Sequence, residues 1–360
     1  MFSSVFSFLV LSAVSVVGLD LTRTDNLAVY WGQNSYGLSN PSDPANWQQT
    51  ISTYCQDSII DIIPIAPSGG AFPGTGLANC QFLAAGIEAC QAAGKAVTIS
   101  LGVGSGAAFT SDAEAVTFAG TIWDLFLGGS SSTRPFGPAV LDGVDLDIES
   151  GDSTGFAAFA AEIRSLTAGA SKPYYLTAAP QCPFPDASVG SAINAVGFDA
   201  VFVQFYNNNC GVSSYPTDFD FGTWDTWAKT VSPNPNVKVF IGAPAAEGAA
   251  NLGQYVDAAT LGSIALATRA QYSSFGGVML WDASQAYAND RYDIQIKDII
   301  ATTSDAGVIG AAGGAEATTS SSAKSVKASA AAKSSQASSA TPVRTGEVKR
   351  GLSDFKFNGT

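Results

Sequence analysis

Histidine is absent from this chain of 360 residues. Without an imidazole base there can be no Ser-His-Asp or Cys-His nucleophile system, and zinc sites built on histidine are excluded as well. Positive charge is also scarce, with 17 lysine and arginine residues against 30 acidic ones. Carboxylates are therefore the natural carriers of any acid–base chemistry in this protein.

The negative charge lies in the body of the chain. The net charge is −13, and from Thr302 onward seven basic and four acidic residues give +3, so residues 1–301 carry −16. Such an acidic surface opposes binding to nucleic acid or to an anionic membrane. A neutral substrate is compatible with it.

Long apolar runs are missing after the N-terminus. Residues 1–18 form an apolar stretch typical of a secretory signal peptide, although the usual basic residue near the start is missing. Five serines make this stretch too short for a membrane anchor, and no later segment reaches about 18 uninterrupted apolar residues. We therefore expect a soluble, secreted protein without a membrane span.

Cysteine is limited to five residues, which are Cys55, Cys80, Cys90, Cys182 and Cys210. Disulfides are expected in a secreted protein. Because the number is odd, at least one thiol is free or pairs with another molecule. The spacing alone does not fix the pairing.

Eight short β-rich runs alternate with helical patterns between Asn26 and Thr302. Near-continuous apolar strands separated by helices are typical of a parallel sheet buried on both faces. We predict an α/β fold, a (β/α)8 TIM barrel over residues 19–303. An open doubly wound sheet is the alternative, but no GxGxxG turn follows the first strand. The expected strands are Leu27–Trp31, Ser58–Ala66, Ala96–Leu101, Gly143–Glu149, Tyr174–Ala179, Ala200–Tyr206, Val237–Ala243 and Gly277–Trp281. The clearest helical patterns are Ala113–Phe126, Thr154–Thr167, Ala258–Ala267 and Ile294–Ala301.

The composition changes at about Ser304. Ala317–Thr341 is nearly all Ser, Ala, Thr and Lys, so residues 304–360 are predicted to form a disordered, O-glycosylated tail. Asn358 begins a glycosylation sequon. The tail is a candidate tether to a cell wall.

The most informative segment is Asp142–Glu149, which reads DGVDLDIE. Its alternation places Asp145, Asp147 and Glu149 on one face of a strand and the apolar Val144, Leu146 and Ile148 on the other. Neighbouring carboxylates raise one another's pKa, which suits a protonated Glu149 acting as a general acid beside an ionised aspartate.

Two other interpretations of this segment compete with acid–base chemistry. A solvated acidic face fits poorly, because the apolar residues between the acids require burial. A site for Mg²⁺ or Ca²⁺ would need further oxygen ligands from other segments, and the sequence leaves that open. We favour acid–base chemistry and expect no metal or cofactor.

Polar and aromatic residues also end other predicted strands. They are Tyr30, Gln204, Tyr206, Asn207 and Trp281. In a barrel these strand ends meet at one rim, where active sites lie. Aromatic faces, amides and carboxylates together suit a sugar, although each aromatic residue alone would fit core packing.

These segments resemble glycoside hydrolase family 18. DGVDLDIE matches the DxxDxDxE signature of that family. Four further segments resemble plant and fungal class III, hevamine-like chitinases, over about residues 25–300. They are Val29–Asn34, Leu176–Asp186, Val203–Asn208 and Gly276–Asp282.

The resemblance implies a retaining, substrate-assisted mechanism, which is an exception to the two-carboxylate scheme. In it Glu149 is the general acid and base, Asp147 orients the substrate's acetamido group with help from Tyr206, and Asp145 sets the charge of Asp147. It further implies that Tyr30, Gln204, Asn207 and Trp281 bind substrate and that Asp142 is structural. The implied substrate is chitin or its N-acetylglucosamine oligomers, bound by a monomer.

The chain departs from the family in two places. The third strand commonly ends SxGG, whereas here Val103 stands at the last position. Of the family's three disulfides, the resemblance supports Cys55–Cys90 and Cys182–Cys210, which leaves Cys80 unpaired. No inserted module separates the last two strands, which by analogy implies a shallow cleft and endo-type cleavage.

The sequence leaves two alternative functions open. An endo-N-acetylglucosaminidase acting on N-glycans shares the same motifs. A non-catalytic lectin or inhibitor would share the barrel, but such relatives usually lack the acid or its aspartate partner. In this chain all four catalytic candidates are present, namely Asp145, Asp147, Glu149 and Tyr206.

Overall fold

The computed structural model describes residues 19–66, 71–73, 75–103 and 108–302. The expected signal peptide (residues 1–18) and the expected tail (residues 304–360, with its sequon) lie outside the described residues. Among the helices described, none is long and apolar enough to cross a bilayer.

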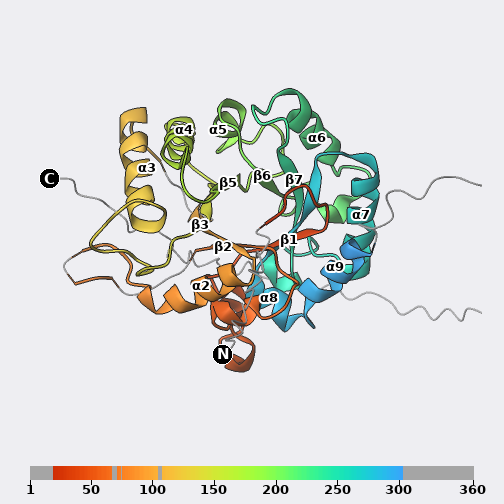
Figure 1. The fold of residues 1–360 in the computed structure, drawn as a ribbon. Coiled ribbons are helices and arrows are strands. Elements are labelled where there is room, and N and C mark those ends of the chain that lie inside the picture. Colours follow the sequence, from red (N-terminus) through yellow and green to blue (C-terminus); the bar gives the residue numbers. More distant parts are fainter. Residues whose placement is uncertain (1–18, 67–70, 74, 104–107, 303–360) are drawn as a thin grey trace, which may run out of the picture.

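Eight parallel strands form a closed barrel in sequential order, surrounded by helices (Figure 1). Closure joins the first strand to the last, with Asn26 opposite Gly277. The predicted TIM barrel is therefore confirmed, and the open-sheet alternative was wrong. The strands are β1 (Asn26–Val29), β2 (Ile62–Ile65), β3 (Ala96–Gly102), β4 (Gly143–Asp147), β5 (Tyr175–Ala178), β6 (Ala200–Gln204), β7 (Lys238–Pro244) and β8 (Phe275–Trp281).

All eight expected strands are present, and β2 differs most from its expected bounds. It was predicted from Ser58 but begins at Ile62. Asp61, just before the strand, uses its carboxylate to accept the backbone N–H of Leu27 at 2.8 Å. The backbone N–H of Leu27 in β1 is therefore bonded to a side chain. In a longer β2 it would have been bonded to a backbone carbonyl.

The helices form the outer layer. They are α1 (Ser35–Ser39), α2 (Ala84–Ala92), α3 (Asp112–Phe126), α4 (Phe156–Thr167), α5 (Gly190–Ala195), α6 (Phe221–Thr230), α7 (Ala258–Gln271), α8 (Ala283–Ala288) and α9 (Tyr292–Ala301). Between β7 and β8 lie only a short 3-10 helix, η5 (Glu247–Ala249), and α7, so the structure confirms that no module is inserted there.

Apolar side chains pack in two separate cores. The larger core lies between the strands and the helices and contains Val144, Leu146 and Ile148. The smaller core includes Tyr30, Phe202, Tyr206, Phe240 and Met279. Since side chains alternate along each strand, the second core fills the inside of the barrel.

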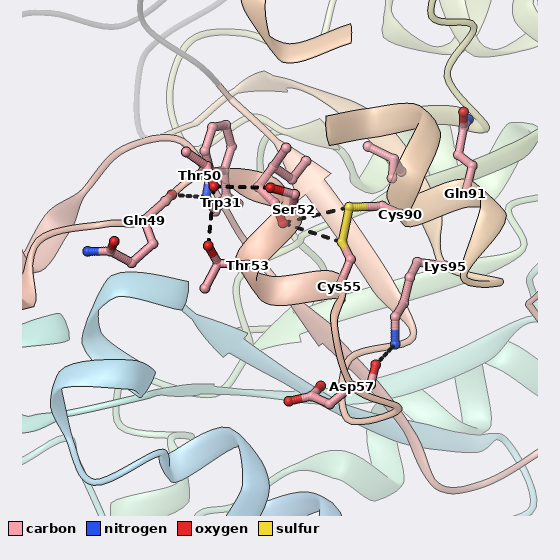
Figure 2. The surroundings of a disulfide bond; sticks show 12 residues. Trp31, Gln49, Thr50, Ser52, Thr53, Cys55, Asp57, Cys90, Gln91 and Lys95 are labelled. Atoms are coloured by element: carbon pink, nitrogen blue, oxygen red, sulfur yellow. Dashed lines mark hydrogen bonds between the residues drawn. A yellow bond between two sulfur atoms is a disulfide. The ribbon is translucent and has the colours of Figure 1, made fainter. Parts of the chain in front are cut away.

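Two disulfides tie loops to the barrel. Cys55–Cys90 joins the segment before β2 to α2 (Figure 2), and Cys182–Cys210 joins the loops after β5 and β6. Cys80 is free and buried. The pairing implied by the family resemblance is therefore confirmed.

Charged groups close the end of the barrel at which the strands begin. Lys297 of α9 is 7% exposed, and its ammonium donates to Asp61 Oδ2 at 2.6 Å and to the Asp25 carbonyl at 2.7 Å. Asp142, just before β4, accepts from Val97 N and pairs with Lys172. These contacts agree with the structural role expected for Asp142.

We predict that Lys297→Met lowers the free energy of unfolding by about 2–3 kcal/mol, because it leaves the largely buried Asp61 without its main counter-charge. Lys172→Met, at a more exposed ion pair, should cost about 1 kcal/mol or less. Urea unfolding of both variants measures the difference. If the two variants lost the same free energy of unfolding, burial of the Lys297–Asp61 pair would not add to its contribution to stability.

Candidate active site

The carboxylates of β4 and its extension lie in a row that leads from the barrel interior to its mouth. Asp145 is fully buried, Asp147 is 2% exposed, and Glu149, two residues beyond the end of β4, is partly exposed. The intervening apolar residues pack in the outer core. The alternation predicted from the sequence is confirmed, and the solvated acidic face was wrong.

Asp145 is held by three hydroxyl groups. Ser100 and Tyr30 donate to its Oδ2 at 2.7 Å each, and Thr177 donates to Oδ1 at 2.6 Å. Ser100 and Thr177 lie directly opposite Asp145 in the two neighbouring strands. Burial raises the pKa of Asp145, and these hydrogen bonds offset part of that rise by stabilising the anion.

This donor set also bears on the metal interpretation. Both oxygens of Asp145 already accept hydrogen bonds from hydroxyl groups. A cation site for Mg²⁺ or Ca²⁺ needs oxygen lone pairs turned toward the ion, whereas here protons are turned toward the carboxylate. The arrangement around Asp145 therefore favours acid–base chemistry over ion binding.

Asp147 and Glu149 both have raised pKa values. Burial is the largest cause of the well-raised pKa of Asp147, followed by the negative charges of Glu149 and Asp145. Burial also raises the pKa of Glu149, an effect that a hydrogen bond from Gln204 opposes and the charge of Asp186 reinforces. Since neighbouring carboxylates cannot all ionise easily in a buried site, the row retains a proton to higher pH than isolated groups would.

Gln204, the last residue of β6, contacts both of these carboxyl groups. Its amide nitrogen lies 3.0 Å from Asp147 Oδ1, 3.0 Å from Glu149 Oε1 and 3.1 Å from the Ala179 carbonyl. The side chain is 4% exposed. Two N–H groups thus serve three acceptors and hold the two carboxyl groups in fixed positions. The sequence indicated a sugar contact and gave no sign of this bridge.

Two aromatic side chains, Tyr206 and Tyr30, complete the interior wall. The pKa of the buried Tyr206 is raised well above its ordinary value by burial and by the charges of Asp147 and Glu149, so its hydroxyl stays protonated and can donate. The Tyr30 ring lies 5.5 Å from the ring of Trp281, at an interplanar angle of 53°. Trp281 is partly exposed and presents an apolar surface beside Tyr30, whose hydroxyl donates to Asp145.

Asn207, which was predicted to bind sugar, has its side chain bonded to a neighbouring loop. It adopts a left-handed conformation with φ 60° and is exposed. Its side-chain oxygen accepts the backbone N–H of Asn251 at 2.8 Å, which links the loops after β6 and β7. Its observed contact braces loops, and sugar binding by Asn207 stays a prediction.

At the end of β3, where the chain departs from the family pattern, two successive residues have a positive φ. A Cβ on Gly102, which has φ 102°, would collide with the carbonyl oxygen of Asp147, so glycine is required there. Val103 follows with φ 46°, a left-handed conformation that is costly for a β-branched residue. Backbone strain therefore lies directly beside the carboxylate row.

Sequence reasoning missed three polar residues of this site. Ser100 and Thr177 could have been found by extending the alternation of β4 to its neighbours. Asp186 ends the segment Leu176–Asp186 that resembles the family, but the strand alternation gave no sign that it lies near Glu149. Its carboxylate accepts the backbone N–H groups of Gln181, Ser188 and Val189, so it organises the loop after β5 while its charge acts on Glu149.

Residues 26–260 match the family described as glycosyl hydrolases family 18. The chain is 46% identical over 301 residues to chitinase 1 of Rhizopus niveus, which covers 78% of this chain and 58% of that protein. It is 40% identical over 319 residues to endochitinase 33 of Trichoderma harzianum, covering 81% and 96%. The chain spans about half the length of the first curated relatives that it matches, from 49% to 58%.

Solved structures show the same barrel in proteins with different names. A chitinase from Ipomoea carnea superposes with a TM-score of 0.64 at 32% identity, covering 76% of this chain and 99% of that one. A xylanase and α-amylase inhibitor protein from Scadoxus multiflorus superposes with a TM-score of 0.63 at 30% identity, covering 75% and 97%.

We predict that Gly102→Ala lowers the free energy of unfolding by about 2 kcal/mol or more, because its methyl group would force β3 away from β4. The control is Gly120→Ala in α3, where a Cβ meets nothing within 4 Å and helix propensity should add about 0.5–1 kcal/mol. Urea unfolding of both variants separates the two effects. A neutral Gly102→Ala would contradict the close approach of the strands.

Proposed function

Because this chain belongs to glycosyl hydrolases family 18, we propose that it is an endo-acting chitinase that hydrolyses β-1,4 linkages between N-acetylglucosamine units. The observation that carries this proposal is the row of buried carboxyl groups that ends at Glu149, at the mouth of the barrel, and is bridged by Gln204. Relatives named chitinase and endochitinase support the substrate.

In the proposed first step, protonated Glu149 donates its proton to the glycosidic oxygen as the bond from that oxygen to the anomeric carbon breaks. The carbonyl oxygen of the substrate's own N-acetyl group attacks the anomeric carbon and forms an oxazolinium ion. Glu149, now a carboxylate, then takes a proton from water as that water attacks the same carbon, and the bond from this carbon to the acetamido oxygen breaks. Two inversions give overall retention, and Glu149 regains its proton.

The surrounding groups fit these roles. An anionic Asp147 would accept the acetamido N–H and stabilise the cationic intermediate, while the protonated Tyr206 hydroxyl would donate to the acetamido oxygen. Asp145, fixed by three hydroxyl groups, adds the negative charge that keeps a proton within the row. Tyr30, Gln204, Asn207 and Trp281 are proposed to bind the sugar.

Two alternative functions would use the same barrel. An endo-N-acetylglucosaminidase would use the same carboxylates on N-glycans. A binding or inhibitory protein is suggested by the inhibitor from Scadoxus multiflorus, yet here the general acid, its aspartate partner and Tyr206 are present together. The short connection between β7 and β8 favours an open cleft and internal cleavage of a long polymer.

We further propose that residues 19–303 act as a monomeric catalytic domain in an extracellular setting. Two disulfides support an oxidising compartment, and the apolar residues 1–18 supply a signal for export. The Ser/Ala/Thr-rich residues 304–360 would then form a glycosylated stalk that links the domain to a cell wall.

We expect Glu149→Gln to lower turnover of N-acetylglucosamine hexamer at least about a thousandfold, because it removes the proton donor. Binding of the hexamer, followed by calorimetry, should change only a few-fold. The matched control is Glu88→Gln, an exposed residue of α2. Near-normal turnover by Glu149→Gln would refute the acid assignment, and saturable binding by an inactive wild type would favour a lectin.

The pH dependence of kcat/KM tests the link between Asp186 and Glu149. Activity requires protonated Glu149, so it falls as pH rises through the raised pKa of that group. Asp186→Asn removes a charge that raises this pKa, and the alkaline limb should therefore move to lower pH. Asp298→Asn, an exposed carboxyl of α9, should leave the limb in place. An unmoved limb in folded Asp186→Asn would contradict the link.

A further inference from the structure

Asp282 is a buried acidic residue that has no part in the proposed mechanism. It follows Trp281, the last residue of β8, and is 1% exposed. Its Oδ1 accepts hydrogen bonds from Ser284 Oγ at 2.6 Å and from Gln285 N at 3.1 Å, and its Oδ2 accepts one from Ser35 N at 3.1 Å. None of the ion pairs formed by the described residues includes Asp282. Because a buried carboxylate without a counter-charge lowers stability unless it is well hydrogen-bonded, these three donors determine where it lies.

One of these donors belongs to a loop at the other end of the chain. Ser35 is the first residue of α1, in the loop after β1, and lies 247 residues before Asp282. The next backbone N–H, that of Tyr36, donates to Ser284 Oγ at 3.0 Å. Asp282 and Ser284 therefore accept two N–H groups that a helix cannot satisfy within its own first turn. We call these two hydrogen bonds the α1–α8 clamp.

The clamp continues the backbone pairing of β1 with β8. Tyr30 N donates to the Leu280 carbonyl at 3.2 Å, and Ala283 N donates to the Tyr30 carbonyl at 2.9 Å. Trp281 and Asp282 lie between the two residues of β8 and α8 that are bonded to Tyr30. The backbone of Trp281 is thus held on one side by strand pairing and on the other by the clamp.

The side chains of this segment reach the candidate active site. The rings of Trp281 and Tyr30 lie 5.5 Å apart, and the Tyr30 hydroxyl donates to Asp145 at 2.7 Å. The charge of Asp282 also adds to the raised pKa of Tyr206, after burial and the charges of the carboxylate row. The clamp therefore adjoins three aromatic residues to which the proposed mechanism gives a part.

Capping of α8 alone would not place Asp282 in this setting. Asp257 shows what a capping aspartate needs, because it accepts Thr260 N at 2.8 Å at the start of α7 and remains exposed. Asp282 makes the equivalent bond to Gln285 N, but it is also buried and bonded to the loop after β1. The contact with a second loop therefore goes beyond the needs of α8.

We propose that Asp282 is a positioning residue for the reaction. By holding the loop after β1 against the end of β8, its carboxylate keeps Trp281, with Tyr30 packed beside it, in the orientation that a sugar ring requires next to the carboxylate row. Contacts that are fixed beforehand bind without the cost of ordering them when the ligand arrives. The inference rests on the proposed function, because it takes Trp281 as a contact of the sugar.

The test uses Asp282→Asn, which turns an NH2 group toward the Ser35 N–H and so removes that hydrogen bond. The remaining oxygen can still accept the Ser284 hydroxyl and the Gln285 N–H, and asparagine caps a helix as well as aspartate does, so α8 keeps its start. The matched control is Asp257→Asn, the same exchange at the start of α7. Ser284→Ala removes the acceptor of the Tyr36 N–H and provides a second variant if Asp282→Asn does not fold.

Affinity for N-acetylglucosamine hexamer is measured by calorimetry in Glu149→Gln, with and without Asp282→Asn. We expect the affinity to fall about tenfold at an unchanged stoichiometry, because Trp281 is displaced in every molecule. In a chain that also carries Trp281→Ala, Asp282→Asn should lower the affinity about threefold or less, since the contact that it positions is already gone. A protein that was merely destabilised would bind fewer hexamers per chain with the same affinity.

Hydrogen exchange of residues 33–40 tests the clamp without any ligand. Asp282→Asn should raise the exchange rate there about tenfold, whereas Asp257→Asn should leave it unchanged. Unchanged exchange in Asp282→Asn would refute the clamp. Faster exchange with an unchanged hexamer affinity, or an equal loss of affinity with and without Trp281, would refute the positioning role alone. If Glu149→Gln itself failed to bind the hexamer, the proposed function would be refuted and the positioning role with it.

Discussion

The structure of the site depends on one buried carboxylate, Asp145, and on the three hydroxyl groups that hold it. Ser100 and Thr177 reach it because β3, β4 and β5 pair in a register that puts the three residues at the same level. Tyr30, the residue after β1, reaches it across the barrel. The positions of Asp147 and Glu149 follow, since they are the next inward-facing residues along the same chain. The chemistry at the mouth of the barrel is therefore set by the backbone pairing of β3, β4 and β5.

The carboxylate row lowers the stability of the folded protein at neutral pH. A carboxyl group whose pKa is higher in the folded than in the unfolded chain favours the folded state while protonated. That advantage is lost as pH rises from the unfolded value through the raised folded value, which is the direction for Asp145, Asp147 and Glu149. The large apolar cores and the charged groups at the other end of the barrel offset this cost.

Much of this architecture could be predicted from local sequence. The eight apolar runs, the alternation of DGVDLDIE and the position of Glu149 beside a loop depend on residues close together in the chain. Gln204 as a bridge, Asn207 as a loop brace and Asp186 beside Glu149 could not be predicted. Each depends on contacts between segments far apart in sequence, and the register of those contacts is fixed only when the barrel closes. The start of β2 was misplaced for a related reason, because a side chain of Asp61 replaces a backbone partner.

The unpaired Cys80 has a consequence for the way in which this chain acquires its fold. In sequence it lies between Cys55 and Cys90, so during oxidation it competes with Cys55 for the same partner. In the finished barrel the thiol is fully buried, which shields it from oxidants and from exchange. Thiol–disulfide exchange with Cys80 is therefore open only to the chain before its core packs, because the folded barrel keeps this thiol away from solvent.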